Sequence, residues 1–133
     1  DTVVLADFAN STGDPVFDDA LKQALSTALR ESPFLNVLSD SSVSNTLRFM
    51  RKEPNTRLTP EITREVCQRS DSKAWIGGSI SNIGNQYIVG VKAVNCQTGD
   101  TLADEQVTAT SKDKVLDVLG QAPAKLRGEL GNP

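Results

Sequence analysis

The sequence contains no histidine, and its 133 residues include only one tryptophan, one tyrosine, one methionine and four phenylalanines. Without histidine the chain cannot build a Ser-His-Asp or Cys-His nucleophile system, and it lacks the most common general base near neutral pH. The usual zinc ligand sets are excluded for the same reason. So few aromatic side chains also leave little for stacking on exposed bases. Any catalysis would therefore depend on carboxylates, lysines or hydroxyls.

The chain also lacks a strong charge and long apolar runs. With 14 basic and 17 acidic side chains its net charge is −3, which is not the basic footprint of a nucleic-acid binder. No apolar run approaches the roughly 20 residues needed to span a bilayer, so we expect no membrane insertion by this segment. The length predicts one domain over residues 1–133. Because Asp1 is not a natural start, we expect an excised piece of a larger protein.

The pattern of apolar residues predicts an α/β fold with a five-stranded mixed sheet, in the strand order 2-1-3-4-5, and helices on both faces. A β-branched and apolar run over residues 2–8 is typical of a buried strand. Apolar residues then recur at helical spacing over residues 17–29, and a second short apolar run follows at 34–38. This succession predicts a parallel strand–helix–strand crossover. Asp14, just before Pro15, is the expected N-cap of the helix.

The second half of the chain predicts helices followed by an antiparallel meander. A short helix is expected around residues 43–50 and another after the capping residue Thr59. Beyond Ser70 the pattern alternates, which predicts three strands joined by tight turns, over residues 73–81, 86–95 and 101–110. A last helix should follow, and Gly120 and Pro123 should kink it or divide it in two.

The turn between the first strand and the first helix is the candidate ligand-binding loop. Open α/β sheets place their crevice at this point, and the amides at a helix N-terminus attract anions. The residues concerned are Asn10, Ser11, Thr12, Gly13 and Asp14. The loop has no Walker lysine and no GxGxxG pattern, and nearby acids would repel a phosphate. The competing interpretation is a structural turn with a helix cap.

Acidic side chains suggest two further hypotheses, both weaker. Carboxylates for a calcium or magnesium site could come from Asp7, Asp14, Asp18 and Asp19. Their spacing does not match an EF-hand, so we predict no metal and no cofactor. A carboxylate-based hydrolase could use acids one helical turn apart, namely Asp113 with Asp117 or Glu61 with Glu65. Solvated charges on a helix face explain these pairs equally well, and we predict no catalytic residues.

One segment concentrates basic side chains. Residues 48–57 contain Arg48, Arg51, Lys52 and Arg57. They could dock an acidic partner, or they could be a solvated helix end and loop.

The two cysteines leave a redox question open. Cys67 lies late in the predicted third helix, and Cys96 ends the predicted fourth strand. If that helix packs on the sheet the two could meet, and a bridge would stabilise the fold by about 3–4 kcal/mol in the loop-entropy model. The alternative is two unpaired thiols, with Cys67 as a small core residue.

Several segments in a fixed order resemble TolB-like amino-terminal domains. In the first part of the chain these are residues 7–15, 20–21, 25–29 and 33–37. In the second part they are residues 76–80, 83–87 and 94–100. The resemblance extends over residues 2–110, and it depends on order and spacing rather than on one motif. Asp7, where relatives often carry proline, and Asp18–Asp19 depart from the pattern.

The resemblance implies a role without catalysis. Such domains lie between a signalling module, such as a protein kinase often followed by a transmembrane helix, and tetratricopeptide repeats. It therefore implies a sensor, interaction or linker domain of a bacterial signalling protein, with other protein modules as partners. It also implies an extracytoplasmic location, which agrees with a Cys67–Cys96 bridge; a cytoplasmic location is the alternative. Contact would occur at the loop of residues 10–14 or at the exposed edge of the meander, where a strand could be added. The alternative function is binding of a small ligand or nucleotide at that loop.

Overall fold

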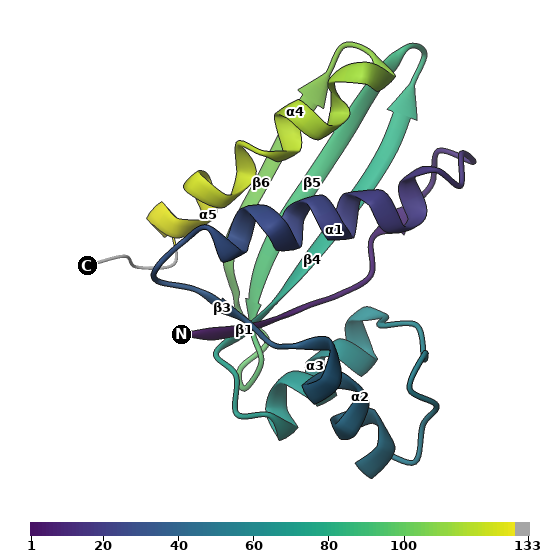
Figure 1. Cartoon of the computed structure of the whole chain (residues 1–133). Helices are drawn as coiled ribbons and strands as arrows, with labels where there is room; N and C mark the ends of the chain where they lie inside the picture. Colours follow the sequence, from purple (N-terminus) through teal and green to yellow (C-terminus); the bar gives the residue numbers. More distant parts are fainter. Residues whose placement is uncertain (130–133) are drawn as a thin grey trace.

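The computed structural model describes residues 1–129 and places a mixed sheet at the centre of an α/β domain (Figure 1). Five strands follow the order β3-β1-β4-β5-β6. Their bounds are β1 Thr2–Leu5, β3 Asn36–Val37, β4 Ala74–Ile83, β5 Gln86–Asn95 and β6 Thr101–Ala109. This confirms the predicted order 2-1-3-4-5. A short extra strand, β2 (Ala9–Asn10), was not predicted and pairs with β4.

The helices cover the two faces of the sheet unequally. They are α1 Phe17–Arg30, α2 Asp40–Phe49, α3 Pro60–Arg69, a 3-10 turn at Lys112–Lys114, α4 Val115–Leu119 and α5 Ala122–Glu129. Figure 1 shows α1, α4 and α5 along one face, whereas α2 and α3 lie against the other face only at one end of the sheet, where α3 packs on β1 and the start of β4. The prediction of helices on both faces is confirmed. Among the described residues no helix is both long enough and apolar enough to cross a membrane.

The parallel half forms as the crossover pattern predicts, with one correction. β1 pairs in parallel with both β3 and β4. The expected continuous strand over residues 2–8 is wrong, because β1 ends at Leu5 and pairing with β4 resumes only at β2. At this break the Ala6 N–H still donates to the Ile76 carbonyl oxygen of β4 (2.9 Å), whereas the Asp7 N–H donates to the carbonyl oxygen of Leu58 (3.1 Å), a residue far away in the sequence. The chain after β1 is thereby tied to the loop that precedes α3.

Of the two predicted N-caps, one is confirmed and one is wrong. Thr59 caps α3 as predicted, since its hydroxyl accepts the Ile62 N–H at 3.4 Å. Asp14 as the N-cap of α1 is wrong, because α1 begins at Phe17 with Val16 in the cap position. Asp14 lies before the proline, and its carboxylate accepts the Val16 N–H (3.1 Å) in a side-chain turn. The divided last helix is confirmed, with a break between α4 and α5.

Two glycines in the middle of β4 let aromatic rings lie directly on the strand. Phe8, which is fully buried, lies over Gly78 on the face that carries α1, and a Cβ at Gly78 would overlap its ring. On the opposite face a Cβ at Gly77 would be 2.7 Å from Cζ3 of Trp75. Glycine in a strand often marks such a close approach. The two hydrophobic clusters, one on each face of the sheet, therefore pack against the same stretch of β4.

Replacement of Gly78 by alanine should destabilise the domain by about 1–3 kcal/mol, because the new methyl group must displace the Phe8 ring from a filled core. The free energy of unfolding, measured by urea denaturation, checks this. Gly120→Ala is the matched control: Gly120 has a φ of −62°, and its Cβ would have no neighbour closer than 3.4 Å. The control should lose no stability. Equal losses in the two variants would contradict the packing argument.

Candidate interaction surface

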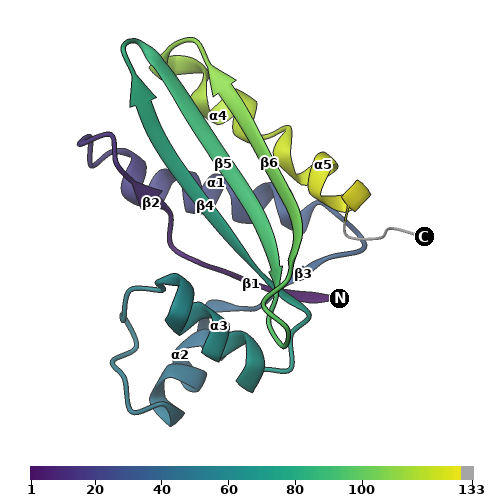
Figure 2. The same cartoon turned by 180° about the vertical axis from the view of Figure 1, so that it is seen from behind.

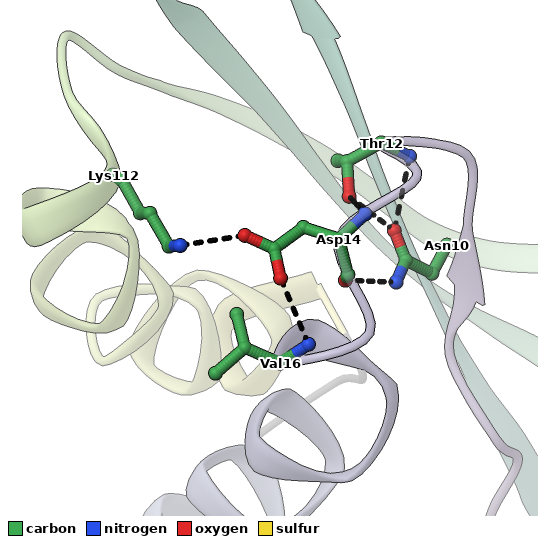
Figure 3. Close-up of polar contacts among 5 residues, drawn as sticks. All are labelled: Asn10, Thr12, Asp14, Val16 and Lys112. Atoms are coloured by element: carbon green, nitrogen blue, oxygen red, sulfur yellow. Dashed lines mark hydrogen bonds and ion pairs between the residues drawn. The ribbon is translucent and has the colours of Figure 1, made fainter.

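The predicted ligand-binding loop is held together by its own side chains (Figure 3). The Asn10 amide donates to the Asp14 carbonyl and to the Asp18 carboxylate, both at 2.9 Å. Its side-chain oxygen accepts from the Thr12 backbone N–H (3.0 Å) and from the Thr12 hydroxyl (2.6 Å). Ser11 bonds across to the Ile80 carbonyl through both its N–H (3.0 Å) and its hydroxyl (3.2 Å). The loop is thus a preformed turn centred on Asn10.

The remaining groups of the loop are also engaged. The Asp14 N–H donates to the Thr12 hydroxyl at 3.1 Å, and Gly13 provides the turn with a φ of +80°. The Asp14 carboxylate forms an ion pair with Lys112, which approaches from the turn before α4. The hydrogen bond from Lys112, followed by that from the Val16 N–H, lowers the pKa of Asp14 below its ordinary value. A ligand would have to replace these bonds, so binding by residues 10–14 stays a prediction.

Asp7 links three elements that are far apart in the sequence. One carboxylate oxygen pairs with Nζ of Lys22 in α1 at 2.8 Å, and the other accepts the Leu58 N–H at 2.7 Å. Burial raises the pKa of Asp7, but the Lys22 hydrogen bond, the Leu58 N–H and the charges of Lys22 and Arg57 outweigh it, so the pKa is lowered. Asp7 is therefore a structural anion that fixes the loop before α3 against α1.

The acidic side chains that the structure describes lie in separate contacts. Asp7 and Asp14 face different lysines, and no group of three or more potential metal ligands is present among residues 1–129. Glu65 pairs with Arg69 along α3 at 2.9 Å, an exposed contact on a helix face. Glu61, Asp113 and Asp117 are exposed as well, and the absence of catalytic residues stays a prediction.

The two cysteines are brought together behind the sheet. Cys67 in α3 and Cys96, directly after β5, are joined by a disulfide with their Cα atoms 5.9 Å apart, and both are fully buried. Arg64 and Gln68 of the same helix donate to the Cys96 carbonyl at 3.0 and 3.1 Å. The bridge and these bonds fasten α3 to the lower end of the meander.

On the side of α2 and α3, no helix within residues 1–129 covers a large part of the meander (Figure 2). Residues alternate between the faces of a strand, and the neighbours Ile76, Ile80, Val89 and Val91 are buried on the opposite face. The bare face therefore presents the intervening residues of the three strands. These are small or polar: Gly77 and Ser79 on β4, Gly90 and Lys92 on β5, and Asp104 and Gln106 on β6.

The same residues line a groove of about 680 Å³. The side chains in its middle are small, because Ser79 lies opposite Gly90 in the strand register. Trp75, only 6% exposed, also lines it, together with Arg57 from the loop before α3 and Pro60 at the start of that helix. We call this the sheet groove, lined by strand residues of β4–β6 together with Ala6, Asp7, Ala9 and residues 57–60.

Trp75 has a particular environment in the lining of the sheet groove. Nζ of Lys92 lies 5.6 Å from the centre of the indole ring, a cation–π contact. The indole Nε1 is buried and has no hydrogen-bond partner among the described residues. This surface is not apparent from the sequence. The signal was present in the alternation of residues 86–95, which puts Lys92 on the face opposite the core, but no local motif marks a groove.

The fold can be compared with solved structures. No protein-family model and no curated protein matches the sequence. The structure is similar to the LpoB C-terminal domain from Salmonella enterica, with a TM-score of 0.73 and 14% identity over 83% of this chain and 82% of that one. The chain has a TolB/LpoB-like fold. It is also similar to TolB from Acinetobacter baumannii, with a TM-score of 0.65 and 13% identity. That match covers 98% of this chain and 28% of the TolB chain.

A third similar structure is lipoprotein GNA1162 from Neisseria meningitidis, with a TM-score of 0.65 and 12% identity over 98% of this chain and 96% of that one. At such identities the comparisons establish the fold. The resemblance to TolB-like domains is thereby confirmed for the architecture, whereas the link to kinases and tetratricopeptide repeats stays a prediction.

The Asp7 contacts predict a specific dependence of stability on pH. Because its pKa is lower in the folded state than the ordinary value of 3.8, Asp7 stabilises the fold above that pH, and this contribution is lost as the pH falls below it. Asp7→Asn should lower the free energy of unfolding at pH 7 by about 1–3 kcal/mol. The difference from the parent protein should shrink as the pH is lowered towards 3.

Urea denaturation between pH 7 and 3 measures this difference. Glu53→Gln is the control, because it neutralises an exposed acid in the loop between α2 and α3. It should change the free energy of unfolding by less than about 0.5 kcal/mol. A deficit in Asp7→Asn that stays constant with pH would contradict the charge argument.

The disulfide predicts that protein prepared under oxidising conditions and denatured without reductant has no titratable thiol, since its two cysteines are paired. Cys67→Ala with Cys96→Ala should lower the free energy of unfolding by about 3–4 kcal/mol, because the unfolded chain loses its cross-link. A thiol assay with Ellman's reagent decides the first point and urea denaturation the second. Two titratable thiols would show that the bridge does not form.

Proposed function

We propose that this domain binds other protein modules through the sheet groove and catalyses no reaction. The observation that carries the proposal is the uneven covering of the meander: three helices cover one face, and the other keeps a groove of about 680 Å³. An aromatic ring, an arginine and small residues line it, a composition that suits protein recognition. The lack of histidine agrees with a role without catalysis, as does the finding that residues 1–129 contain no group of three or more potential metal ligands.

The geometry favours the sheet groove over the two surfaces predicted from the sequence, which are the loop of residues 10–14 and the exposed edge of the meander. The side chains of Asn10, Ser11, Thr12 and Asp14 are engaged with one another or with Asp18, Ile80 and Lys112. At the free edge of the sheet, β6 pairs only with β5 among the described strands and carries Asp104 and Glu105. Charges on an edge strand oppose the addition of another strand. Strand addition at β6 therefore has less support than binding across the bare face.

We further propose an extracytoplasmic location. The Cys67–Cys96 disulfide requires an oxidising compartment, and the fold is shared with a protein described as a lipoprotein. The role of sensor or linker in a kinase with tetratricopeptide repeats rests on the resemblance of the sequence to TolB-like domains in such proteins. Whether a kinase and tetratricopeptide repeats are encoded in the same chain as this domain tests that context directly.

Photo-crosslinking tests the proposed surface in the full-length chain within its own cells. Benzoylphenylalanine in place of Gln106, which lines the sheet groove, should form adducts with another protein module. The same residue in place of Asp117, exposed on α4 beyond the opposite face, should form few. Ser79→Phe should reduce the Gln106 adducts at least fivefold, because the new ring can lie over Gly90 and fill the groove.

Thr108→Phe is the matched control, because it adds the same ring to β6 at an exposed position outside the lining of the groove. It should leave the adducts unchanged. Equal crosslinking in Ser79→Phe and in the parent chain would refute binding in the groove. A parallel thermal-shift screen with nucleotides, phosphates and sugars should give no response; a reproducible shift with a nucleotide would instead support ligand binding at residues 10–14.

A further inference from the structure

The end of α2 carries an exposed aromatic ring surrounded by basic side chains. Phe49 is 82% exposed, the largest value among the large apolar side chains that the structure describes as exposed. Arg48 precedes it, and Arg51 and Lys52 follow it, all of them exposed. We call these four residues, Arg48, Phe49, Arg51 and Lys52, the α2 tip. Figures 1 and 2 show the end of α2 at the opposite end of the molecule from the β4–β5 hairpin.

The fold itself does not require these side chains. The inner face of α2 consists of Val43, Leu47 and Met50, which pack in the smaller hydrophobic cluster, and Phe49 points away from it. The side chains of the three basic residues make no hydrogen bond or ion pair within residues 1–129. An aromatic ring left in water has no stabilising role in the isolated domain.

The backbone at Arg51 strengthens this argument. Arg51 follows the C-cap of α2 with a φ of 60°, the left-handed conformation that glycine adopts with less strain. The backbone therefore does not favour an arginine at this position. Both Phe49 and Arg51 are poorly suited to stabilising the domain, and together they present an aromatic ring beside guanidinium groups.

Charge indicates the kind of partner. Residues 48–57 carry a net charge of +3 in a chain of −3, so the rest of the chain carries −6. From these observations we propose that the α2 tip docks an acidic protein surface with an apolar pocket that accepts the Phe49 ring. Guanidinium groups bind carboxylates through paired hydrogen bonds, and both phenylalanine and arginine are enriched at protein interfaces.

An anionic membrane is the competing partner, and the structure favours it less. Helices that lie in a membrane interface present a whole apolar face. The apolar face of α2 is packed against the domain, and Phe49 alone remains outside. The α2 tip is separate from the sheet groove, so this proposal and the proposed function can fail independently.

The test uses nuclear magnetic resonance titration of the isotope-labelled chain with two probes, a peptide of Glu-Glu-Leu repeats and its Lys-Lys-Leu counterpart. The acidic peptide should shift the amide signals of residues 48–52 in a saturable manner, and salt should weaken the binding. The basic peptide should cause no such shifts. Vesicles of phosphatidylcholine with phosphatidylglycerol form the third arm, and binding to them without binding to the acidic peptide would overturn the proposal in favour of a membrane.

Three variants separate binding from folding. Phe49→Ala and the pair Arg48→Glu with Arg51→Glu should each weaken binding of the acidic peptide about tenfold. Arg51→Gly should weaken binding while raising the unfolding midpoint, because glycine relieves the left-handed strain.

The controls are Phe34→Ala, a half-exposed phenylalanine at 51%, and Lys125→Glu, an exposed lysine on α5. Both should leave the affinity unchanged. Either the absence of shifts at residues 48–52, or equal affinities in Phe49→Ala and Phe34→Ala, would refute the proposal.

Discussion

The rest of the structure depends on the close approach of two aromatic rings to the middle of β4. β4 is shared by both halves of the sheet, since it pairs in parallel with β1 and β2 and antiparallel with β5. Gly77 and Gly78 allow Trp75 and Phe8 to lie on opposite faces of this strand. Larger residues at positions 77 and 78 would displace these rings and disturb the packing of both hydrophobic clusters.

The unequal distribution of the helices then determines where the domain can make contact. α2 and α3 are held at the lower end of the sheet by the Cys67–Cys96 disulfide and by the contacts of Asp7 with Lys22 and Leu58. Because they are fixed there, they do not extend over the upper meander, and the sheet groove remains open. The α2–α3 pair also holds the α2 tip away from the sheet. The domain therefore has two separate surfaces, the sheet groove and the α2 tip.

The prediction from sequence succeeded where short-range chemistry decides and failed where distant segments meet. The strand order, the Thr59 cap and the divided last helix followed from periodicity, proline and glycine. The break after Leu5 did not, and the chain there bonds through Asp7 to Leu58, which is far away in the sequence. The loop of residues 10–14 was recognised as a turn with polar groups, but the sequence could not show that these groups satisfy one another.

By itself, the sequence determined a histidine-free, mildly acidic α/β domain with a parallel first half and an antiparallel meander. Those properties depend on composition and on alternation within single segments. Only the tertiary structure decided which face of the meander stays bare, that Cys67 lies beside Cys96, and that Phe49 points into water. Each of these depends on where α2 and α3 pack, and that placement results from contacts between residues far apart in the sequence, which no local pattern records.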